Sequence, residues 1–226
     1  MSEDPPVRFA STVVVLRDGK QGLEVLLVRR VSTLAFYGGA WVFPGGRIDD
    51  ADHDSAISDE ERALHAAATR AASRELHEEA GLTVAPVDLK YFARWLTPPG
   101  RTRRFDTFYF SALAPSGEVK VDMGEVDDHR WMKPIDALDA HEQSEIELPP
   151  PTFVTLVSLV PFATASEAHE TLPVRGTHYI PRPCKTDEGI VYLYPGDAGY
   201  DASDPASGAP HHRLIAAGPK WRYVGR

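Results

Sequence analysis

The sequence predicts an α/β fold in which a mixed β-sheet carries helices on both faces and an irregular C-terminal extension follows. Strand-like segments interleave with helix-like segments, but without the strict β-α-β alternation of a parallel sheet. The 226 residues are enough for one large domain with a substantial core. From about residue 163 onward, proline and glycine become frequent, which marks the extension.

The N-terminal part is predicted to begin with a β-hairpin. Residues 11–17 and 23–30 are rich in valine and leucine, and a glycine-containing turn at residues 18–22 joins them. Residues 41–43 form a further short strand that runs into the turn Pro44-Gly45-Gly46.

A long helix is expected next. Ser58, as the N-cap, and Glu61 have the form of a capping box. The chain then contains no glycine or proline until Gly81, so we expect one helix of about twenty residues. Its apolar stripe has a spacing of four residues and consists of Ala68, Ala72, Leu76 and Ala80.

The later elements are shorter. Strands are predicted at residues 89–96, 105–113, 190–194 and 212–217, and a further short strand is predicted to end at Trp131. Helices are predicted at residues 134–138 and 151–162. Trp221 and Tyr223 are unsuited to a flexible tail. Residues 163–226 are therefore expected to be an ordered extension that packs on the main domain or forms a contact between the copies of a homodimer.

Composition excludes several classes of function. The net charge of −9 argues against general nucleic-acid binding, although it allows a small phosphorylated substrate. A single cysteine, Cys184, excludes an intrachain disulfide and a cysteine-rich metal site. The N-terminus lacks a signal-peptide pattern, and no apolar run approaches the roughly twenty residues of a membrane span. We therefore expect a cytoplasmic protein without membrane association.

Three carboxylates share one face of the predicted helix. Glu75, Glu78 and Glu79 lie at positions i, i+3 and i+4, where like charges destabilise a helix unless a cation compensates them. A hard divalent cation suits oxygen ligands, whereas the alternative is a solvated acidic face. The helix-ending Gly81 and the upstream Pro-Gly-Gly turn favour the metal site. A calcium-binding loop is excluded, because residues 49–54 lack the twelve-residue ligand pattern.

The run from Arg74 to Leu82, Arg-Glu-Leu-His-Glu-Glu-Ala-Gly-Leu, resembles the second half of the Nudix box. In the first half of that motif, a glutamate follows a glycine after five residues, and here Asp52 stands at that distance from Gly46. The family has seven residues between this acid and the arginine, whereas this chain has the 21 residues from His53 to Ser73. The sequence therefore keeps the second half of the motif, which carries the metal-binding glutamates, but not the usual spacing between the acid of the first half and the arginine. The nearby acidic residues are interpreted as turn and solvating residues, with the alternative that one of them reaches a metal-bound water. They are Asp49, Asp50, Asp52 and Asp54.

The resemblance implies an α/β/α sandwich and a metal-dependent hydrolase that cleaves a nucleoside diphosphate linked to another moiety. Residues 1–162 would form the catalytic domain, with residues 53–73 as an insertion and extended helix. Mg²⁺ or Mn²⁺ would be bound by Glu75 and Glu79, by Glu78 as a ligand or water-holder, and by the backbone carbonyl of Gly45. Arg74 would orient a helix carboxylate.

The general base stays open between Glu125 on a later loop and Glu78 or Glu79 acting through a bound water. Three retained helix glutamates with Arg74 favour hydrolysis over the alternative, a Nudix-fold nucleotide-binding or regulatory module that does not hydrolyse its ligand.

The substrate assignment rests on a second resemblance. Leu26, Leu27, Arg30, Gly39 and the Phe-Pro-Gly-Gly turn match the extra motif of the coenzyme A pyrophosphatase branch, and residues 36–52 with the insertion are similar to the Nudix-19-type group. Val28, Val31 and Ala35 depart from the motif. Coenzyme A or acyl-CoA is therefore the leading substrate. The predicted binding residues are Arg30, Arg103, Arg104 and Phe105, although the two arginines beside Phe105 equally fit a solvated hairpin tip.

Overall fold

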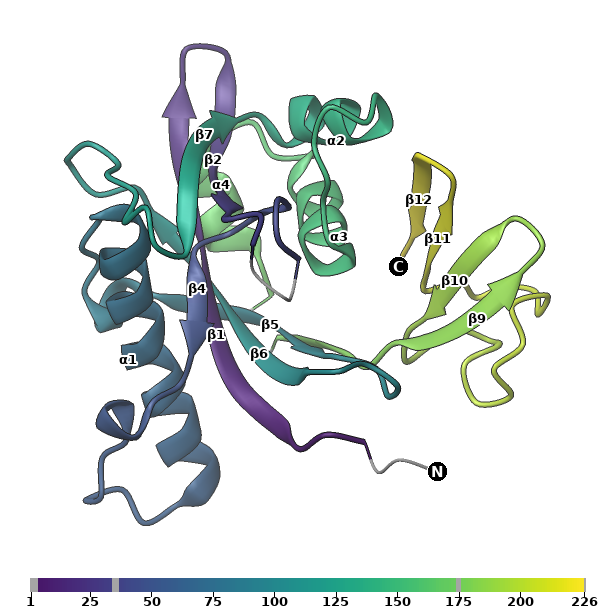
Figure 1. Cartoon of the computed structure of the whole chain (residues 1–226), viewed down its shortest axis with the longest axis horizontal. Helices are drawn as coiled ribbons and strands as arrows, with labels where there is room; N and C mark the ends of the chain where they lie inside the picture. The colour runs from purple at the N-terminus through teal and green to yellow at the C-terminus, as the bar shows by residue number, and fades with distance from the viewer. Residues whose placement is uncertain (1–3, 34–36, 174–175, 226) are drawn as a thin grey trace.

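The computed structural model describes residues 4–33, 37–173 and 176–225. In this part of the chain the strands form one sheet of eight strands and one of four (Figure 1). The large sheet has the order β3-β2-β1-β6-β5-β8, while β4 pairs with β1 and β7 pairs with β2. Its strands are β1 (Val7–Gly19), β2 (Gly22–Arg30), β3 (Trp41–Val42), β4 (Gly45–Arg47), β5 (Lys90–Leu96), β6 (Arg104–Leu113), β7 (Val126–Met132) and β8 (Thr177–Tyr179).

The large sheet is mixed, as predicted. The pairs β1–β6 and β5–β8 are parallel, whereas β1–β2, β2–β7 and β5–β6 are antiparallel. Strand β1 lies in the middle and pairs with three partners, which places its N-terminal half beside β4 and the Pro-Gly-Gly turn.

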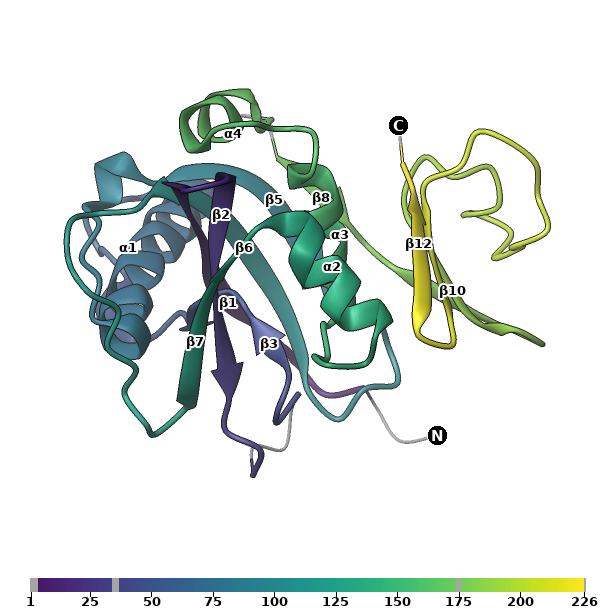
Figure 2. The same cartoon turned by 90° about the horizontal axis from the view of Figure 1, so that it is seen from above.

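Alternating residues of β1 serve two separate cores. Val13 and Val15 pack against the helix α1 (Glu60–Ala80), whereas Val14 and Leu16 pack on the opposite face. That opposite face is covered by α2 (Pro134–Glu142), α3 (Pro150–Leu159) and α4 (Ala165–Thr171). Figure 2 shows the sheet between these two helical layers, which confirms the expected α/β/α sandwich.

Helix α1 has 21 residues, which confirms the predicted length. Its buried stripe contains all four predicted residues, Ala68, Ala72, Leu76 and Ala80. The predicted N-cap was wrong by one residue, because the Asp59 carboxylate, and not the Ser58 hydroxyl, accepts the Arg62 N–H at 2.8 Å. Gly81 ends the helix in the left-handed conformation at φ 68°.

The small sheet has the order β12-β11-β10-β9 and lies at the end of the molecule remote from α1 (Figure 1). Its strands are β9 (Arg182–Thr186), β10 (Gly189–Leu193), β11 (Arg213–Ala217) and β12 (Lys220–Val224). Short 3-10 helices at Asp50–Asp52 and Pro86–Asp88 flank α1 in the sequence.

Aromatic contacts connect the small sheet to the rest of the fold. Tyr194, which follows β10, contacts Trp95 of β5 edge-on with ring centroids 5.6 Å apart, and Tyr179 of the large-sheet strand β8 stacks on the same Trp95. Trp221 of β12 contacts His141 of α2 and Phe153 of α3. Among the described helices, none combines the length and the apolar character that a membrane crossing requires.

Candidate functional site

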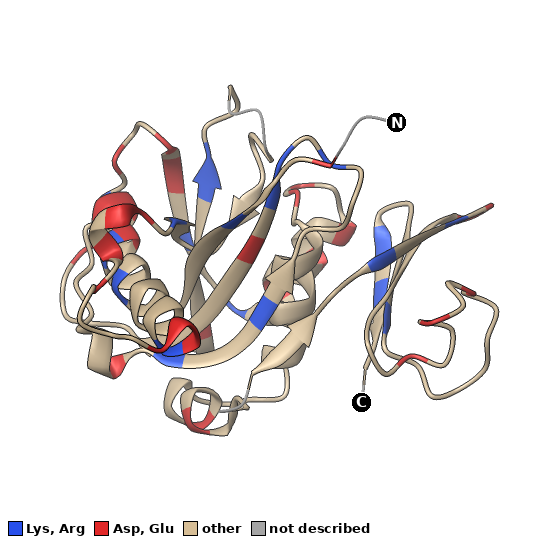
Figure 3. Cartoon of the chain, turned by 90° about the horizontal axis from the view of Figure 1, so that it is seen from below, with Lys and Arg blue, Asp and Glu red and all other residues tan. Residues whose placement is uncertain are grey.

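The last turns of α1 present three glutamates with different degrees of burial. The side chain of Glu78 is 55% exposed and that of Glu75 is 13% exposed, whereas Glu79 is 3% exposed as a residue. Acidic residues occupy both ends of α1 (Figure 3), but only this end faces the Pro-Gly-Gly turn. The helix face that was predicted to carry the three glutamates therefore extends from the protein interior, at Glu79, to the solvent, at Glu78.

Gly45 and Gly46 were predicted as part of a turn, but they are the first two residues of β4, and they allow α1 to approach this strand closely. The Gly45 N–H donates a hydrogen bond to Oε2 of Glu79 at 2.8 Å. A side chain on Gly45 would overlap the Ser11 carbonyl oxygen, and one on Gly46 would overlap the carboxylate of Glu75. Gly45 and the buried Glu79 are thus neighbours, as the sequence prediction for the metal site requires.

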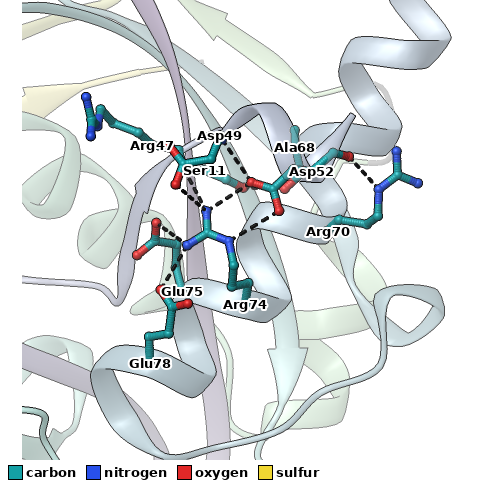
Figure 4. A network of polar contacts seen from close by, with 9 residues as sticks. All are labelled: Ser11, Arg47, Asp49, Asp52, Ala68, Arg70, Arg74, Glu75 and Glu78. Carbon is teal, nitrogen blue, oxygen red and sulfur yellow. Dashed lines mark hydrogen bonds and ion pairs between the residues drawn. The ribbon is translucent and has the colours of Figure 1, made fainter. Parts of the chain in front are cut away.

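Arg74 connects the helix to the loop that precedes it (Figure 4). Its guanidinium donates to both carboxylate oxygens of Asp52 at 3.2 and 2.9 Å. It also donates to Glu75 and Glu78, at 2.9 Å each, and to the carbonyl of Arg47. One arginine therefore orients two helix glutamates while it grips the loop.

The interpretation of Asp52 as a solvating turn residue was wrong. Its carboxylate is buried and accepts hydrogen bonds from Arg74 and from the Asp49 N–H. Burial on its own raises the pKa of Asp52, but the Arg74 guanidinium and the Asp49 N–H outweigh burial and lower it. Asp52 forms an ion pair with Arg74 although 21 residues separate them in the sequence. The fold therefore brings the acid of the first half of the motif next to the arginine of the second half.

Burial and mutual repulsion disfavour the charged forms of the inner glutamates. Burial, together with the charges of Glu75 and Glu125, raises the pKa of Glu79 to about 8, against the hydrogen bond from Gly45 and the charge of Arg30. Burial, Glu78 and Glu125 likewise raise the pKa of Glu75, against Arg74. A nearby cation would reverse both effects.

The donor set around Glu79 suits a divalent metal ion. Oε1 of Glu79 is buried and has no hydrogen-bond partner in the described structure. Carboxylate oxygens are the ligands that Mg²⁺ and Mn²⁺ prefer. As the side chains stand, no three histidine, cysteine or acidic side chains in the described ranges converge on one point. The unpartnered Glu79 oxygen nevertheless fits such an ion. The Glu75 carboxylate, which packs on Gly46 and accepts a hydrogen bond from Arg74, lies near enough to Glu79 to raise its pKa and can supply a second carboxylate ligand.

A cavity of about 1060 Å³ opens beside these carboxylates. Its lining includes Arg74, Glu75 and Glu78, and also Glu125, the predicted candidate for the general base. The structure also brings the predicted substrate-binding residues to this cavity, which are Arg30, Arg103, Arg104 and Phe105. Its volume is at the upper end of the range for small-molecule sites.

The arginines of the cavity differ in their partners. Nε of Arg30 is buried with no hydrogen-bond partner among the described residues. Arg104 donates to the Thr97 carbonyl and lies 3.7 Å from a carboxylate oxygen of Asp4, while Arg103 is exposed. Three positive side chains therefore surround space that a phosphorylated ligand can occupy.

The sequence did not indicate that residues from the C-terminal extension line the cavity. Pro181, Tyr192 and Tyr194 do so, although they follow the glutamates by about a hundred residues. Tyr192 and Tyr194 belong to a recognisable strand-like segment, but the sequence carries no signal for what that strand faces.

Residues 7–150 match the family model described as NUDIX domain. Human Acyl-coenzyme A diphosphatase NUDT19 is 36% identical over 119 residues, which cover 50% of this chain and 32% of that protein. The Caenorhabditis elegans protein named putative nudix hydrolase 7 is 25% identical, over 85% of this chain and 75% of its own length.

Among solved structures, a NUDIX hydrolase from Alicyclobacillus acidocaldarius superposes with a TM-score of 0.65 at 27% identity. The superposition covers 75% of this chain and 98% of that one. The matches to the acyl-coenzyme A diphosphatases from human, Xenopus laevis and Gallus gallus span only about a third of the length of those relatives.

Proposed function

Because this chain belongs to the NUDIX domain family, we propose that it is a metal-dependent diphosphatase that cleaves a nucleoside diphosphate linked to another moiety. Coenzyme A or acyl-CoA is the leading substrate. The observation that carries the proposal is the packing of Glu75 and Glu79 on Gly46 and Gly45, with one buried Glu79 oxygen that has no hydrogen-bond partner among the described residues.

In this proposal, Glu75 and Glu79 hold Mg²⁺ or Mn²⁺, together with Glu78 and the carbonyl of Gly45. When bound, such an ion would neutralise charge on the diphosphate oxygens and lower the pKa of a coordinated water. Arg74 acts as a positioning residue, since it fixes Glu75 and Glu78 relative to the loop at Asp52.

The remaining roles follow from the cavity lining. Glu125 lies at the cavity and close enough to raise the pKa of Glu75 and of Glu79, so it can take a proton from an attacking water. Glu78 or Glu79 acting through a bound water is the alternative base. Arg30, Arg103 and Arg104 bind phosphate oxygens of the substrate, and Phe105 packs on the nucleobase of the substrate.

Support for the substrate class comes from the relatives named acyl-coenzyme A diphosphatase and from the size of the cavity. We also propose that residues 1–162 form the catalytic domain, while residues 163–226 contribute part of the cavity wall.

The test is a hydrolysis panel of coenzyme A, ADP-ribose, NADH, diadenosine polyphosphates and capped RNA, each with Mg²⁺, Mn²⁺ or EDTA. Cleavage of coenzyme A to 4′-phosphopantetheine and 3′,5′-ADP, abolished by EDTA, is the expected result. Cleavage of another compound would replace the substrate assignment. No cleavage, combined with a ligand-induced rise in melting temperature, would contradict hydrolysis and support a binding module.

A further inference from the structure

The cavity has an aromatic wall that the proposed chemistry does not use. Trp95 of β5 and Tyr109 of β6 come from the large sheet, whereas Tyr192 and Tyr194 come from β10 and the residue after it. The last two lie beyond residue 150, where the match to the family model ends. This part of the wall is therefore a feature of the extension.

Two buried hydrogen-bond donors in this wall have no partner within residues 4–33, 37–173 and 176–225. They are the indole Nε1 of Trp95 and the phenol oxygen of Tyr194, in residues that are 4% and 0% exposed. Their rings lie 5.6 Å apart, nearly perpendicular to each other. Buried side-chain donors are nearly always hydrogen-bonded, so two unpartnered donors in residues that line one cavity indicate an acceptor supplied by a ligand.

The surrounding structure holds both donors in place. One face of Trp95 is covered by the stacked ring of Tyr179, with an angle of 2° between the planes. Tyr194 contacts the same Tyr179 ring edge-on at 5.2 Å, and its backbone N–H donates to the His212 carbonyl. Because tertiary contacts from two sheets fix the two rings, the donors are preorganised and not free to find other partners.

The chemistry of the wall selects a neutral acceptor. The neighbouring side chains, Tyr109, Tyr179 and Tyr192, are aromatic and uncharged. Burial keeps the pKa of the Tyr194 phenol well above its ordinary value, so the phenol remains a donor at neutral pH. A carbonyl oxygen is a neutral acceptor with two lone pairs, and it suits such an uncharged wall.

We propose that Trp95 and Tyr194 form a specificity site for a carbonyl oxygen in an amide-bearing arm of the substrate. This inference rests on the proposed function and deepens it, because the arm is the part of the substrate beyond the diphosphate. Coenzyme A carries such an arm, with two amides in its pantetheine portion, whereas ADP-ribose does not.

The test compares Tyr194→Phe and Trp95→Phe with the control Tyr91→Phe, which removes a phenol on the α1 face of the sheet. Loss of one hydrogen bond should raise KM for coenzyme A about 3- to 10-fold, with kcat within about twofold. The inhibition constant of 3′,5′-ADP, which lacks the amide arm, should not change. An unchanged KM in both variants, or equal weakening of 3′,5′-ADP, would overturn the inference.

Calorimetric titration with pantetheine alone separates this inference from the hydrolytic proposal. Pantetheine should bind the wild-type protein, and more weakly each variant, whether or not coenzyme A is cleaved. Absence of wild-type binding, or equal binding to all proteins, would contradict the amide site. Pantetheine binding that depends on the two donors, without hydrolysis of coenzyme A, would contradict only the proposed activity.

Discussion

Single residues of the site either supply negative charge, as the glutamates of α1 do, or allow α1 to approach β4 closely, as the two glycines do. Glu79 is buried, with one oxygen hydrogen-bonded to Gly45 and the other without a partner in the described part of the chain, whereas Glu78 is largely exposed. The same residue type therefore has different surroundings at neighbouring positions on one helix. These surroundings predict different consequences of substitution.

Glu79→Gln should abolish turnover while leaving the fold intact. A neutral amide cannot act as an anionic ligand, so kcat should fall at least about 100-fold. Mg²⁺ should raise the melting temperature of the wild type but not of the variant. Glu61→Gln, in the exposed first turn of the same helix, is the matched control. Near-wild-type activity of Glu79→Gln would rule out its role as a metal ligand.

Gly46→Ala should reduce activity with little change in stability. The new methyl group would overlap the carboxylate of Glu75, which is the end of a flexible side chain and can move away. We expect kcat to fall about 10-fold or more, with the melting temperature within a few degrees of the wild type. Gly208→Ala is the control, because no atom lies within 4 Å of its added carbon. Equal activity of the two variants would show that the position of Glu75 is unimportant.

At the level of elements, α1 and the loop before it form a single unit through Asp52 and Arg74. The sequence predicted α1 well, because its spacing of apolar residues and its terminal glycine are local signals. The role of Asp52 could not be predicted, because its partner is fixed by the folded path of the loop. The short elements α4, β8, β9 and β12 were not predicted, since tertiary contacts, more than local preference, determine such segments. Ser58 and Asp59 are adjacent residues that both suit an N-cap, so the sequence alone did not distinguish them.

Asp52→Ala should affect both stability and catalysis. It leaves the Arg74 guanidinium without its two-oxygen partner in a half-buried site, at a cost of about 1–3 kcal/mol in the free energy of unfolding. The mobile arginine would also position Glu75 less well, so kcat should fall. Urea unfolding and steady-state kinetics measure the two effects. The control Asp50→Ala changes an exposed acid in the same short 3-10 helix and should alter neither.

The small sheet contains a buried ion pair that should make it acid-sensitive. Although burial alone raises the pKa of Asp197, hydrogen bonds from Arg213, His212 and Gly199 lower it to about 2. A lowered pKa means that the stabilisation is complete above the unfolded value near 3.8 and is lost as the pH falls toward 2.

This loss amounts to about 2 kcal/mol in the free energy of unfolding. Urea titrations at pH 6, 4 and 2.5 measure it. Asp197→Asn should be destabilised by about 3 kcal/mol at pH 6, since Arg213 is left buried without a counter-charge, and should lack this pH dependence. The exposed Asp187→Asn should behave as the wild type does. An identical pH profile for Asp197→Asn would show that other acids cause the acid sensitivity.

For the molecule as a whole, aromatic contacts join the small sheet to the main body. Tyr194, which follows β10, lies edge-on to Trp95 of β5, and Trp221 of β12 packs on His141 and Phe153. Because Tyr192 and Tyr194 line the cavity from this sheet, its attachment also determines the shape of the proposed substrate site.

Trp221→Ala should loosen the small sheet without unfolding the large one. Loss of a partly buried indole costs about 1–3 kcal/mol, and this loss falls on one contact region. Hydrogen exchange measured by mass spectrometry should become faster in β9–β12 and stay unchanged in β1, β2 and β6. Lys220→Ala removes an exposed ion pair between β12, the strand that also carries Trp221, and Glu142 of α2, and it should leave exchange unchanged. Faster exchange throughout the protein would indicate that the two sheets unfold together.

The contact between Asp52 and Arg74 also explains why a long insertion is compatible with this site. Chain-closure entropy grows only with the logarithm of loop length, so a connection of 21 residues in place of seven adds about 1 kcal/mol. Most of the added residues are helical and extend α1 at the end remote from the carboxylates. This end of the helix can therefore change in length during evolution while the spacing between the reactive groups stays constant.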